Sequence, residues 1–199
     1  MATTDLVAAI EIILASASPR RRQLLTEMGL SFEVVTADIP ELDAISSPHL
    51  LPVELARENA RLKASVVAKL HPKRWVLGAD TVVALEKRLL GKPISLEEAH
   101  HFLRTLSGRT HEVITGCALF DPEGNVNIFH EMSRVVFREL SDETIQRYLA
   151  EVSVLDKAGA YALQERGDWI VERVEGSRSN VIGLPIERLG QIFKERGLT

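Results

Sequence analysis

The sequence predicts a protein of the α/β or α+β class with a mixed sheet, and two observations carry this prediction. Strand and helix patterns alternate over the first half of the chain, which favours strands connected through helices. Residues 111–140 then hold two long strand patterns joined at the turn "DPEGN", which predicts an inserted hairpin. A length of 199 residues fits one domain, or a single elongated unit of two lobes, with a sizeable core.

The first half of the chain alternates short strands with helices. The apolar runs 11–16 and 32–37 predict strands, and 75–85 is a nearly unbroken apolar strand interrupted by "GAD". Ser18 followed by Pro19 predicts a helix start. A longer helix covers 53–71, where apolar or small residues recur at helical spacing. Between them, the acids and prolines of 38–52 predict a flexible loop.

The second half begins with a turn at 89–94 and a helix at 95–108, which has Ser95 as its cap, acids in its first turn and Gly108 as its stop. After the hairpin, 141–152 predicts another capped helix. Residues 160–176 predict two more strands, 175–180 a flexible polar stretch, and 186–197 the last helix.

Composition excludes several classes of protein. The chain is 45% hydrophobic and 26% charged, as globular proteins are, and its net charge of −4 argues against a general nucleic-acid binder. No apolar run reaches membrane-spanning length, and the N-terminus lacks a basic start before its apolar stretch, so we expect a cytoplasmic protein with no membrane partner. The single Cys117 cannot form an internal disulfide, and we expect a buried residue rather than a nucleophile.

Three arginines, Arg20 to Arg22, stand at the start of the first helix, where the charge is unfavourable. A helix N-terminus carries unsatisfied N–H groups and a partial positive charge, so each cation there costs a few tenths to about 1 kcal/mol. The cluster therefore suggests that an anion binds there. On the same reasoning, removing Arg21 should leave the stability of the empty protein unchanged or slightly raised.

Three further charged residues are candidates for chemistry. Asp80 lies inside an apolar strand, where a carboxylate is costly to bury unless it binds a cation or a proton donor, although a strand end or bulge facing water fits the pattern equally. Lys92 in "GKP" suits a phosphate contact, or is an ordinary exposed turn lysine. Glu41 is either solvated or, with Asp80, a ligand for Mg²⁺.

Other nucleotide and metal signatures are missing from the sequence. It contains no G-x-x-x-x-G-K-[ST] and no G-x-G-x-x-G, so any phosphate site is built from arginines. His100 and His101 are adjacent on a helix, and His111 with Glu112 lacks the second histidine of a zinc motif, so we expect structural roles for all three.

Taken together, the motifs resemble those of the Maf family of nucleoside triphosphate pyrophosphatases. The matching stretches are "LASASPRR", "ADIPE", "ARENA", "LGADTVV", "GKP", "LSGRTHEVITG", "DKAGAYALQ" and "VIGLP", which span almost the whole chain. The resemblance implies one Maf-like α/β domain over 1–199, elongated, with a mixed central sheet flanked by helices, a cleft between two lobes, and an architecture related to the inosine triphosphate pyrophosphatases. It also implies a divalent cation, Mg²⁺ or Mn²⁺, and hydrolysis of a nucleoside triphosphate to its monophosphate and pyrophosphate.

The resemblance also implies roles for particular residues. Ser16, Arg20 and Arg21 match the phosphate- and nucleotide-binding loop, Asp80 matches the catalytic carboxylate, and Glu41, Lys92 and Gln164 match further positions in the cleft, with Asp80 and Glu41 as the expected metal ligands. Arg20, Thr81 and Gln164 match the branch of the family that acts on dTTP and UTP. A glutamine amide can both donate to and accept from the edge of uracil or thymine, which is consistent with that division.

One position departs from the family pattern. Where "ARE-K-A" is common this chain has Asn59, which is neutral, and Lys63 lies one helical turn further along the same face, with a stem long enough to reach back. Two alternative functions stay open at this stage. One is a purine or modified-nucleotide pyrophosphatase of the inosine triphosphate type, and the other is a nucleotide-binding regulator of septum formation. A homodimer is likewise left open.

Overall fold

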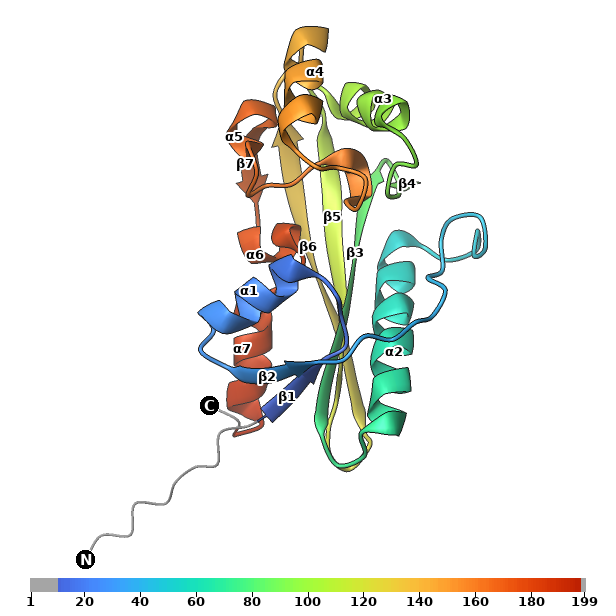
Figure 1. The fold of residues 1–199 in the computed structure, drawn as a ribbon, viewed down its shortest axis with the longest axis vertical. Helices are drawn as coiled ribbons and strands as arrows, with labels where there is room; N and C mark the ends of the chain where they lie inside the picture. The colour runs from blue at the N-terminus through green and yellow to red at the C-terminus, as the bar shows by residue number, and fades with distance from the viewer. Residues whose placement is uncertain (1–10, 198–199) are drawn as a thin grey trace, which may run out of the picture.

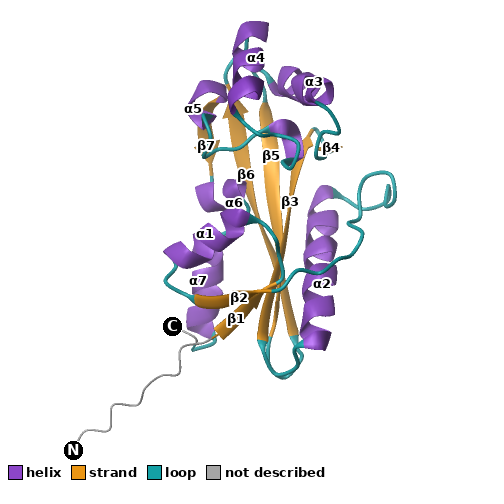
Figure 2. Cartoon of the chain, in the orientation of Figure 1, coloured by secondary structure: helices purple, strands orange, loops and turns teal. Residues whose placement is uncertain are grey.

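The computed structural model describes residues 11–197 and contains one mixed sheet of seven strands flanked by helices (Figures 1 and 2). The strands are β1 (Glu11–Leu14), β2 (Ser31–Val34), β3 (Trp75–Leu85), β4 (Arg88–Leu90), β5 (Thr110–Phe120), β6 (Val126–Phe137) and β7 (Val171–Glu175). Their order is β2-β1-β3-β5-β6-β7, with β4 paired to β3. The fold class expected from the sequence is therefore confirmed.

Parallel and antiparallel strands occupy different parts of the sheet. β1 pairs in parallel with β2 and with the first residues of β3, whereas β3, β5, β6 and β7 pair antiparallel. β3, β5 and β6 are the long strands, and they run along the length of the molecule (Figure 1). β5 and β6 form the hairpin predicted at the turn 121–125, where Asp121 accepts a hydrogen bond from the backbone of Asn125.

Helices cover both faces of one end of this sheet. α1 (Pro19–Glu27) and α7 (Ile186–Glu195) pack on one face, where Leu25, Leu77, Cys117 and Phe193 belong to one buried cluster. α2 (Pro52–Leu70) packs on the other face through small residues such as Ala60. Successive strand side chains point to opposite faces, which is why neighbouring residues of β3 enter different clusters.

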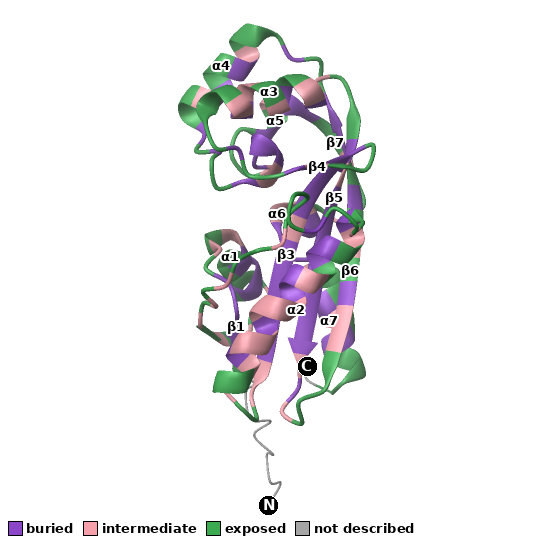
Figure 3. Ribbon diagram, turned by 90° about the vertical axis from the view of Figure 1, so that its right-hand side faces the viewer, coloured by how far each residue is buried: buried purple, intermediate pink, exposed green. Residues whose placement is uncertain are grey.

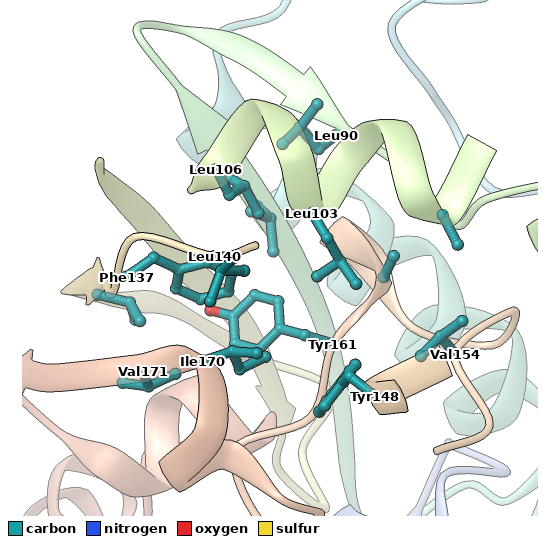
Figure 4. Packing of buried hydrophobic residues seen from close by; sticks show 14 of the residues in the cluster. Leu90, Leu103, Leu106, Phe137, Leu140, Tyr148, Val154, Tyr161, Ile170 and Val171 are labelled. Carbon is teal, nitrogen blue, oxygen red and sulfur yellow. The ribbon is translucent and has the colours of Figure 1, made fainter. Parts of the chain in front are cut away.

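The other end of the sheet has its own core. α3 (Leu96–Leu106) and α4 (Asp142–Glu151) pack there over a cluster that includes Leu103, Phe137, Tyr148 and Tyr161 (Figure 4). Ser95 and Ser141 cap these two helices as the sequence predicts, each accepting a hydrogen bond from the third residue beyond it. In Figure 3 the central strands β3 and β5 are largely purple, because they are buried along most of their length.

α2 lies unusually close to the sheet because two glycines face it. A Cβ atom built on Gly78 of β3 would stand 2.4 Å from the carbonyl oxygen of Ala60, and one on Gly116 of β5 would stand 2.4 Å from the backbone of Ala56. Any side chain larger than hydrogen would push the helix away. This close approach brings the polar face of α2 within reach of Asp80.

The structure corrects the prediction for residues 160–176. Only one of the two expected strands, β7, is present, and it follows the 3₁₀ turn η1 (Ala158–Ala160) and the short helix α5 (Gly167–Ile170). The positive φ angles of Gly159 (71°), Ala160 (61°) and Arg166 (52°) interrupt the extended backbone. The apolar pattern of this segment comes from packing on the core rather than from strand pairing.

Two shorter segments also differ from the prediction. Residues 88–90, expected within or beside a turn, form β4, which pairs antiparallel with the end of β3. The chain reverses between the two strands at Glu86 and Lys87, whose φ values are 51° and 69°. The stretch 175–180, expected to be flexible, leads into the helix α6 (Arg178–Ile182), in which Asn180 is fully buried.

In the part of the chain that is described, no helix is both long and apolar enough to cross a membrane. Residues 1–10, which belong to the N-terminal stretch used for the expectation of a cytoplasmic protein, lie outside the described residues. The expectation that 1–199 forms a single domain of two lobes stays a prediction.

Candidate active site

A cleft of about 370 Å³ opens between the N-terminus of α1, the face of α2, the middle of β3 and the segment 156–164. All the candidate residues taken from the sequence line it: Ser16, Arg20, Arg21, Glu41, Lys63, Asp80, Thr81, Lys92 and Gln164. They come from six separate stretches of the chain. The structure thus brings together every residue that the motifs singled out.

Arg21 is a buried cation without a carboxylate partner in the part of the chain that is described. Its side chain donates from Nε to the carbonyl of Gly183 (2.8 Å), from Nη1 to Ser16 Oγ (3.0 Å) and from Nη2 to Thr81 Oγ1 (3.1 Å). Burial lowers the pKa of this guanidinium, while the nearby charge of Asp80 opposes the effect. Three of its five N–H groups are used on neutral oxygens, so two remain for an anion in the cleft.

These contacts correct the expectation that removing Arg21 would be harmless or stabilising. The guanidinium does not lie exposed over the helix N-terminus; it turns inward and joins α1 to Gly183 and to β3. The neighbouring Arg22 is exposed, and Arg20 pairs with Asp156 at 3.3 Å. The unfavourable dipole interaction is therefore smaller than the loss of three hydrogen bonds.

Asp80 is 7% exposed and is held from two sides by α2. Its Oδ1 accepts from Lys63 Nζ at 2.6 Å, and its Oδ2 accepts from Asn59 Nδ2 at 3.2 Å. The water-facing strand end or bulge that the sequence left open is thereby excluded, because Asp80 pairs in register with Gly116 in the middle of β3 and β5. The cationic group that α2 places at Asp80 is Lys63.

Asn59, also on α2, forms hydrogen bonds both to Asp80 and to Leu42. Its amide accepts from the backbone N–H of Leu42 (2.8 Å) and donates to the carbonyl of Leu42 (3.0 Å), in addition to its bond with Asp80. The side chain is 3% exposed and uses both donor hydrogens. Asn59 thus connects two parts of the site through hydrogen bonds: the irregular loop, which contains Leu42 and Glu41, and the carboxylate of Asp80.

Glu41 lies between two lysines. One carboxylate oxygen contacts Lys63 Nζ at 2.6 Å and the other contacts Lys92 Nζ at 3.0 Å. Burial would raise the pKa of Glu41, but the hydrogen bonds and charges of Lys63 and Lys92 outweigh it and lower the pKa to about 2. Glu41 is thus an anion throughout the physiological pH range and forms an ion pair with each of the two lysines.

The carboxylate oxygens of Asp80 and Glu41 are the type of ligand that a divalent cation prefers. Both carboxylates already converge on one positive group, Lys63 Nζ, at 2.6 Å each. Mg²⁺ and Mn²⁺ take carboxylate oxygens and are commonly completed by substrate phosphates and water. Within residues 11–197 no group of three or more His, Cys, Asp or Glu side chains is clustered for a metal.

Sequence analysis missed Lys157, which is 6% exposed and lines the cleft next to Arg20. Its ammonium contacts Asp156 (2.9 Å), Glu165 (3.5 Å) and the carbonyl of Ser153. Asp156 in turn pairs with Arg20, so this lysine supports the far wall of the cleft. The signal that could have found it is the motif "DKAGAYALQ", which contains Lys157 but from which only Gln164 was taken as a site residue.

Apolar side chains and the exposed Gln164 also line the cleft. The apolar ones include Val83, Tyr161, Leu163 and Ile182. The lining of the cleft therefore combines charged side chains, Asp80 among them, with apolar side chains and one amide. Such a lining suits a ligand that has both an anionic chain and a flat ring.

The cysteine and the histidine candidates lie outside this chemistry. Cys117 is buried, as predicted, and burial raises the pKa of its thiol to about 12, so it is not a nucleophile. His111 is buried against Tyr161 and Phe137, bonds the hydroxyl of Tyr161 at 2.8 Å, and has its pKa lowered to about 4 by burial. It is a structural residue, as expected.

Fold and cleft define a class: an α/β protein with a mixed sheet whose central cleft is lined by arginine and lysine side chains. The family model described as "Maf-like protein" matches residues 11–196. The chain belongs to the Maf family.

Similar proteins from three bacteria cover most of this chain, and each is named dTTP/UTP pyrophosphatase. The protein from Akkermansia muciniphila is 48% identical over 88% of this chain and 90% of its own. The one from Pelotomaculum thermopropionicum is 43% identical over 94% of this chain and 97% of its own. The one from Nitratidesulfovibrio vulgaris is 42% identical over 98% of this chain and 92% of its own.

Among solved structures, the fold resembles that of Ham1 proteins. The structure of a HAM1 protein from Coxiella burnetii has a TM-score of 0.52 at 17% identity, and the Staphylococcus aureus Ham1 protein has 0.50 at 19%. Each match covers 94% of this chain and 99% of the other. At these identities the likeness concerns the fold alone.

Proposed function

We propose that this protein hydrolyses dTTP and UTP to the nucleoside monophosphate and pyrophosphate. One observation carries the proposal: a buried guanidinium with two uncommitted N–H groups, Arg21, lies in the same cleft as a buried carboxylate, Asp80. A buried cation without a carboxylate partner among the described residues is costly unless an anion completes it. The names of the three relatives described above supply the substrate class.

The phosphate chain binds at the N-terminus of α1 in this proposal. Ser16 Oγ accepts from Arg21 and keeps its own hydrogen for a phosphate oxygen, and Arg21 supplies its two remaining N–H groups. The backbone N–H groups at the start of the helix add to the same anion site. Lys63 and Lys92 neutralise charge that develops on the phosphates during the reaction.

Asp80 is the proposed base. A water between Asp80 and the α-phosphorus gives its proton to the carboxylate, its oxygen bonds to phosphorus, and the bond to the bridging oxygen breaks, releasing pyrophosphate. Asn59 and Lys63 hold the carboxylate in place for this step. A Mg²⁺ or Mn²⁺ ion bound by Asp80 and Glu41 would supply further charge neutralisation and water activation.

The base lies toward Gln164 in this arrangement. An amide can donate to O4 and accept from N3–H of uracil or thymine, and apolar side chains that line the same cleft cover the ring. A site built from hydrogen-bonding groups rejects a mismatched edge by several decades, so dTTP and UTP are expected to react much faster than purine nucleotides.

The test is pyrophosphate release from purified protein with Mg²⁺ or Mn²⁺ and a panel of dTTP, UTP, CTP, GTP, ITP and 7-methyl-GTP. The proposal expects the highest kcat/KM for dTTP and UTP. Equal or higher values for GTP, ITP or 7-methyl-GTP would favour the purine or modified-nucleotide alternative. Tight binding of nucleotide with no hydrolysis of any of them would favour a regulator of septum formation.

Location in the cytoplasm and assembly as a homodimer stay predictions that accompany this proposal. Gel filtration with light scattering tests the second.

A further inference from the structure

Behind the cleft, a chain of buried hydrogen bonds connects Asn180 of α6 to Arg21. The Asn180 side chain is fully buried, and its amide donates to the carbonyl of Val113 (3.0 Å) and to Ser133 Oγ (2.9 Å). Its Oδ1 accepts from the N–H of Thr115 at 3.1 Å. Every hydrogen-bonding group of this side chain is therefore engaged, and its position is fixed by β5 and β6.

The direction of the next bonds follows from counting hydrogens. Thr115 Oγ1 lies 2.9 Å from the carbonyl oxygen of Asn180, which can only accept, so the single hydroxyl hydrogen of Thr115 points there. Thr115 Oγ1 also lies 2.9 Å from Thr81 Oγ1. Because Thr115 has no second hydrogen, Thr81 must be the donor in that contact.

Thr81 is then fully committed as a donor. Its hydrogen points at Thr115, away from the cleft, and its oxygen accepts from Arg21 Nη2 at 3.1 Å. If Thr81 instead pointed its hydrogen at Arg21, two hydrogens would face each other and the bond would be lost. The carbonyl of Asn180 thus fixes the direction of the Thr115 hydroxyl, and the Thr115 hydroxyl fixes that of Thr81. As a result, Thr81 presents an acceptor oxygen to Arg21.

Ser16 shows the contrast on the other side of the same guanidinium. It accepts from Arg21 Nη1 at 3.0 Å, and none of its contacts among the described residues uses its hydroxyl hydrogen. Ser16 can therefore donate to a ligand directly, whereas Thr81 cannot.

We propose that Thr115 and Asn180 are positioning residues for the phosphate site, and that Thr81 acts by holding Arg21 rather than by donating to the nucleobase. The proposal rests on the proposed function in one respect, namely that a triphosphate binds at Arg21. Its consequence is specific: disturbing the hydroxyl chain weakens binding of the phosphate chain by the same factor whatever base is attached.

The experiment compares Thr115→Val, which removes the hydroxyl at nearly constant shape, with Thr115→Ser, which keeps it. Calorimetry with inorganic triphosphate measures the phosphate site without a base, and kinetics with dTTP, UTP and GTP measure selectivity. Thr110→Val, an exposed change on the same strand, is the matched control and leaves all values unchanged.

For Thr115→Val we expect about tenfold weaker binding of inorganic triphosphate, the order lost with one hydrogen bond to a charged group. The KM for each nucleotide should rise by the same factor, with kcat changed less and the dTTP to GTP preference unaltered. Thr115→Ser should recover most of the affinity. Thr81→Val, at a half-buried position that faces the cleft, should repeat the pattern and serves if Thr115→Val does not fold.

Three results would overturn the inference. They are wild-type affinity for inorganic triphosphate in the folded valine variants, a changed dTTP to GTP preference with that affinity intact, and failure of the wild-type protein to bind inorganic triphosphate. If the wild-type protein binds inorganic triphosphate but releases pyrophosphate from no nucleotide, the proposed function fails, while the calorimetric comparison still decides on the positioning residues.

Discussion

Replacing Asp80 by asparagine tests the proposed chemistry and the geometry that supports it. Two donors face the Asp80 carboxylate, Lys63 Nζ at 2.6 Å and Asn59 Nδ2 at 3.2 Å. An amide has one oxygen, so in either orientation its NH₂ group meets a donor. One unsatisfied buried contact costs about 1–3 kcal/mol, and Lys63 keeps Glu41 as its partner. At about 2–4 °C per kcal/mol for a chain of this size, the melting temperature should fall by about 2–12 °C.

The same change should lower kcat by about two to three decades, because an amide cannot take the proton from the attacking water. Pyrophosphate release at saturating dTTP measures the loss, and thermal unfolding measures the fold. Asp142→Asn is the control, since this carboxylate is 58% exposed on α4 and is not among the residues that line the cleft. Near wild-type turnover by a folded Asp80→Asn protein would refute the base role, and an unchanged melting temperature would refute the two-donor arrangement.

Four further outcomes are expected. Arg21→Ala should lower the melting temperature of the nucleotide-free protein by several degrees, because three acceptors lose their donor; an unchanged value contradicts this. Gln164→Glu should reduce kcat/KM for dTTP about tenfold or more relative to ITP, and an unchanged ratio would remove Gln164 from base recognition. Burial lowers the pKa of His111 to about 4, from 6.5 in the unfolded chain, so near pH 5 the unfolded chain binds a proton that the folded protein does not. The contribution of His111 to the free energy of unfolding is therefore complete above about pH 6.5 and declines toward pH 4. Urea titrations should therefore show about 2 kcal/mol lost between pH 7 and pH 5, and the loss should disappear in His111→Gln. Gly78→Ala should destabilise by about 3 kcal/mol or more, since the new Cβ would stand 2.4 Å from a carbonyl of α2; a melting curve like that of the wild type would contradict that packing.

Local patterns in the sequence were sufficient for most of the fold. Ser18, Ser95 and Ser141 cap the helices that they were predicted to start, and the turn 121–125 joins the long hairpin. These features depend on neighbouring residues, so the sequence carries them directly. The failed strand within 160–176 had an apolar pattern as well, but positive φ angles at three residues, two of them non-glycine, were not visible in it.

For the candidate site, too, the sequence predicted one part and not another: it identified the residues but not all of their contacts. The motifs named the residues of the cleft, yet they did not show that Arg21 turns inward to Gly183 or that Asn59 binds Leu42 and Asp80 together. Such roles depend on contacts between segments far apart in the chain. Asn180 illustrates this most clearly, because a polar stretch of six residues favours a flexible surface loop until the carbonyl of Val113 and the side chain of Ser133 are brought against it.

The long strands have a mechanical consequence for the cleft. β3 and β5 pass without interruption from the core under α1, α2 and α7 to the core under α3 and α4, and Asp80 lies midway along β3 (Figure 1). The two cores therefore cannot swing about a linker; a change in their separation must bend or twist a continuous sheet, with the strain shared among many hydrogen-bonded pairs. The sheet acts as an elastic element, so any closure around a nucleotide is opposed by a restoring force that favours reopening once pyrophosphate has left.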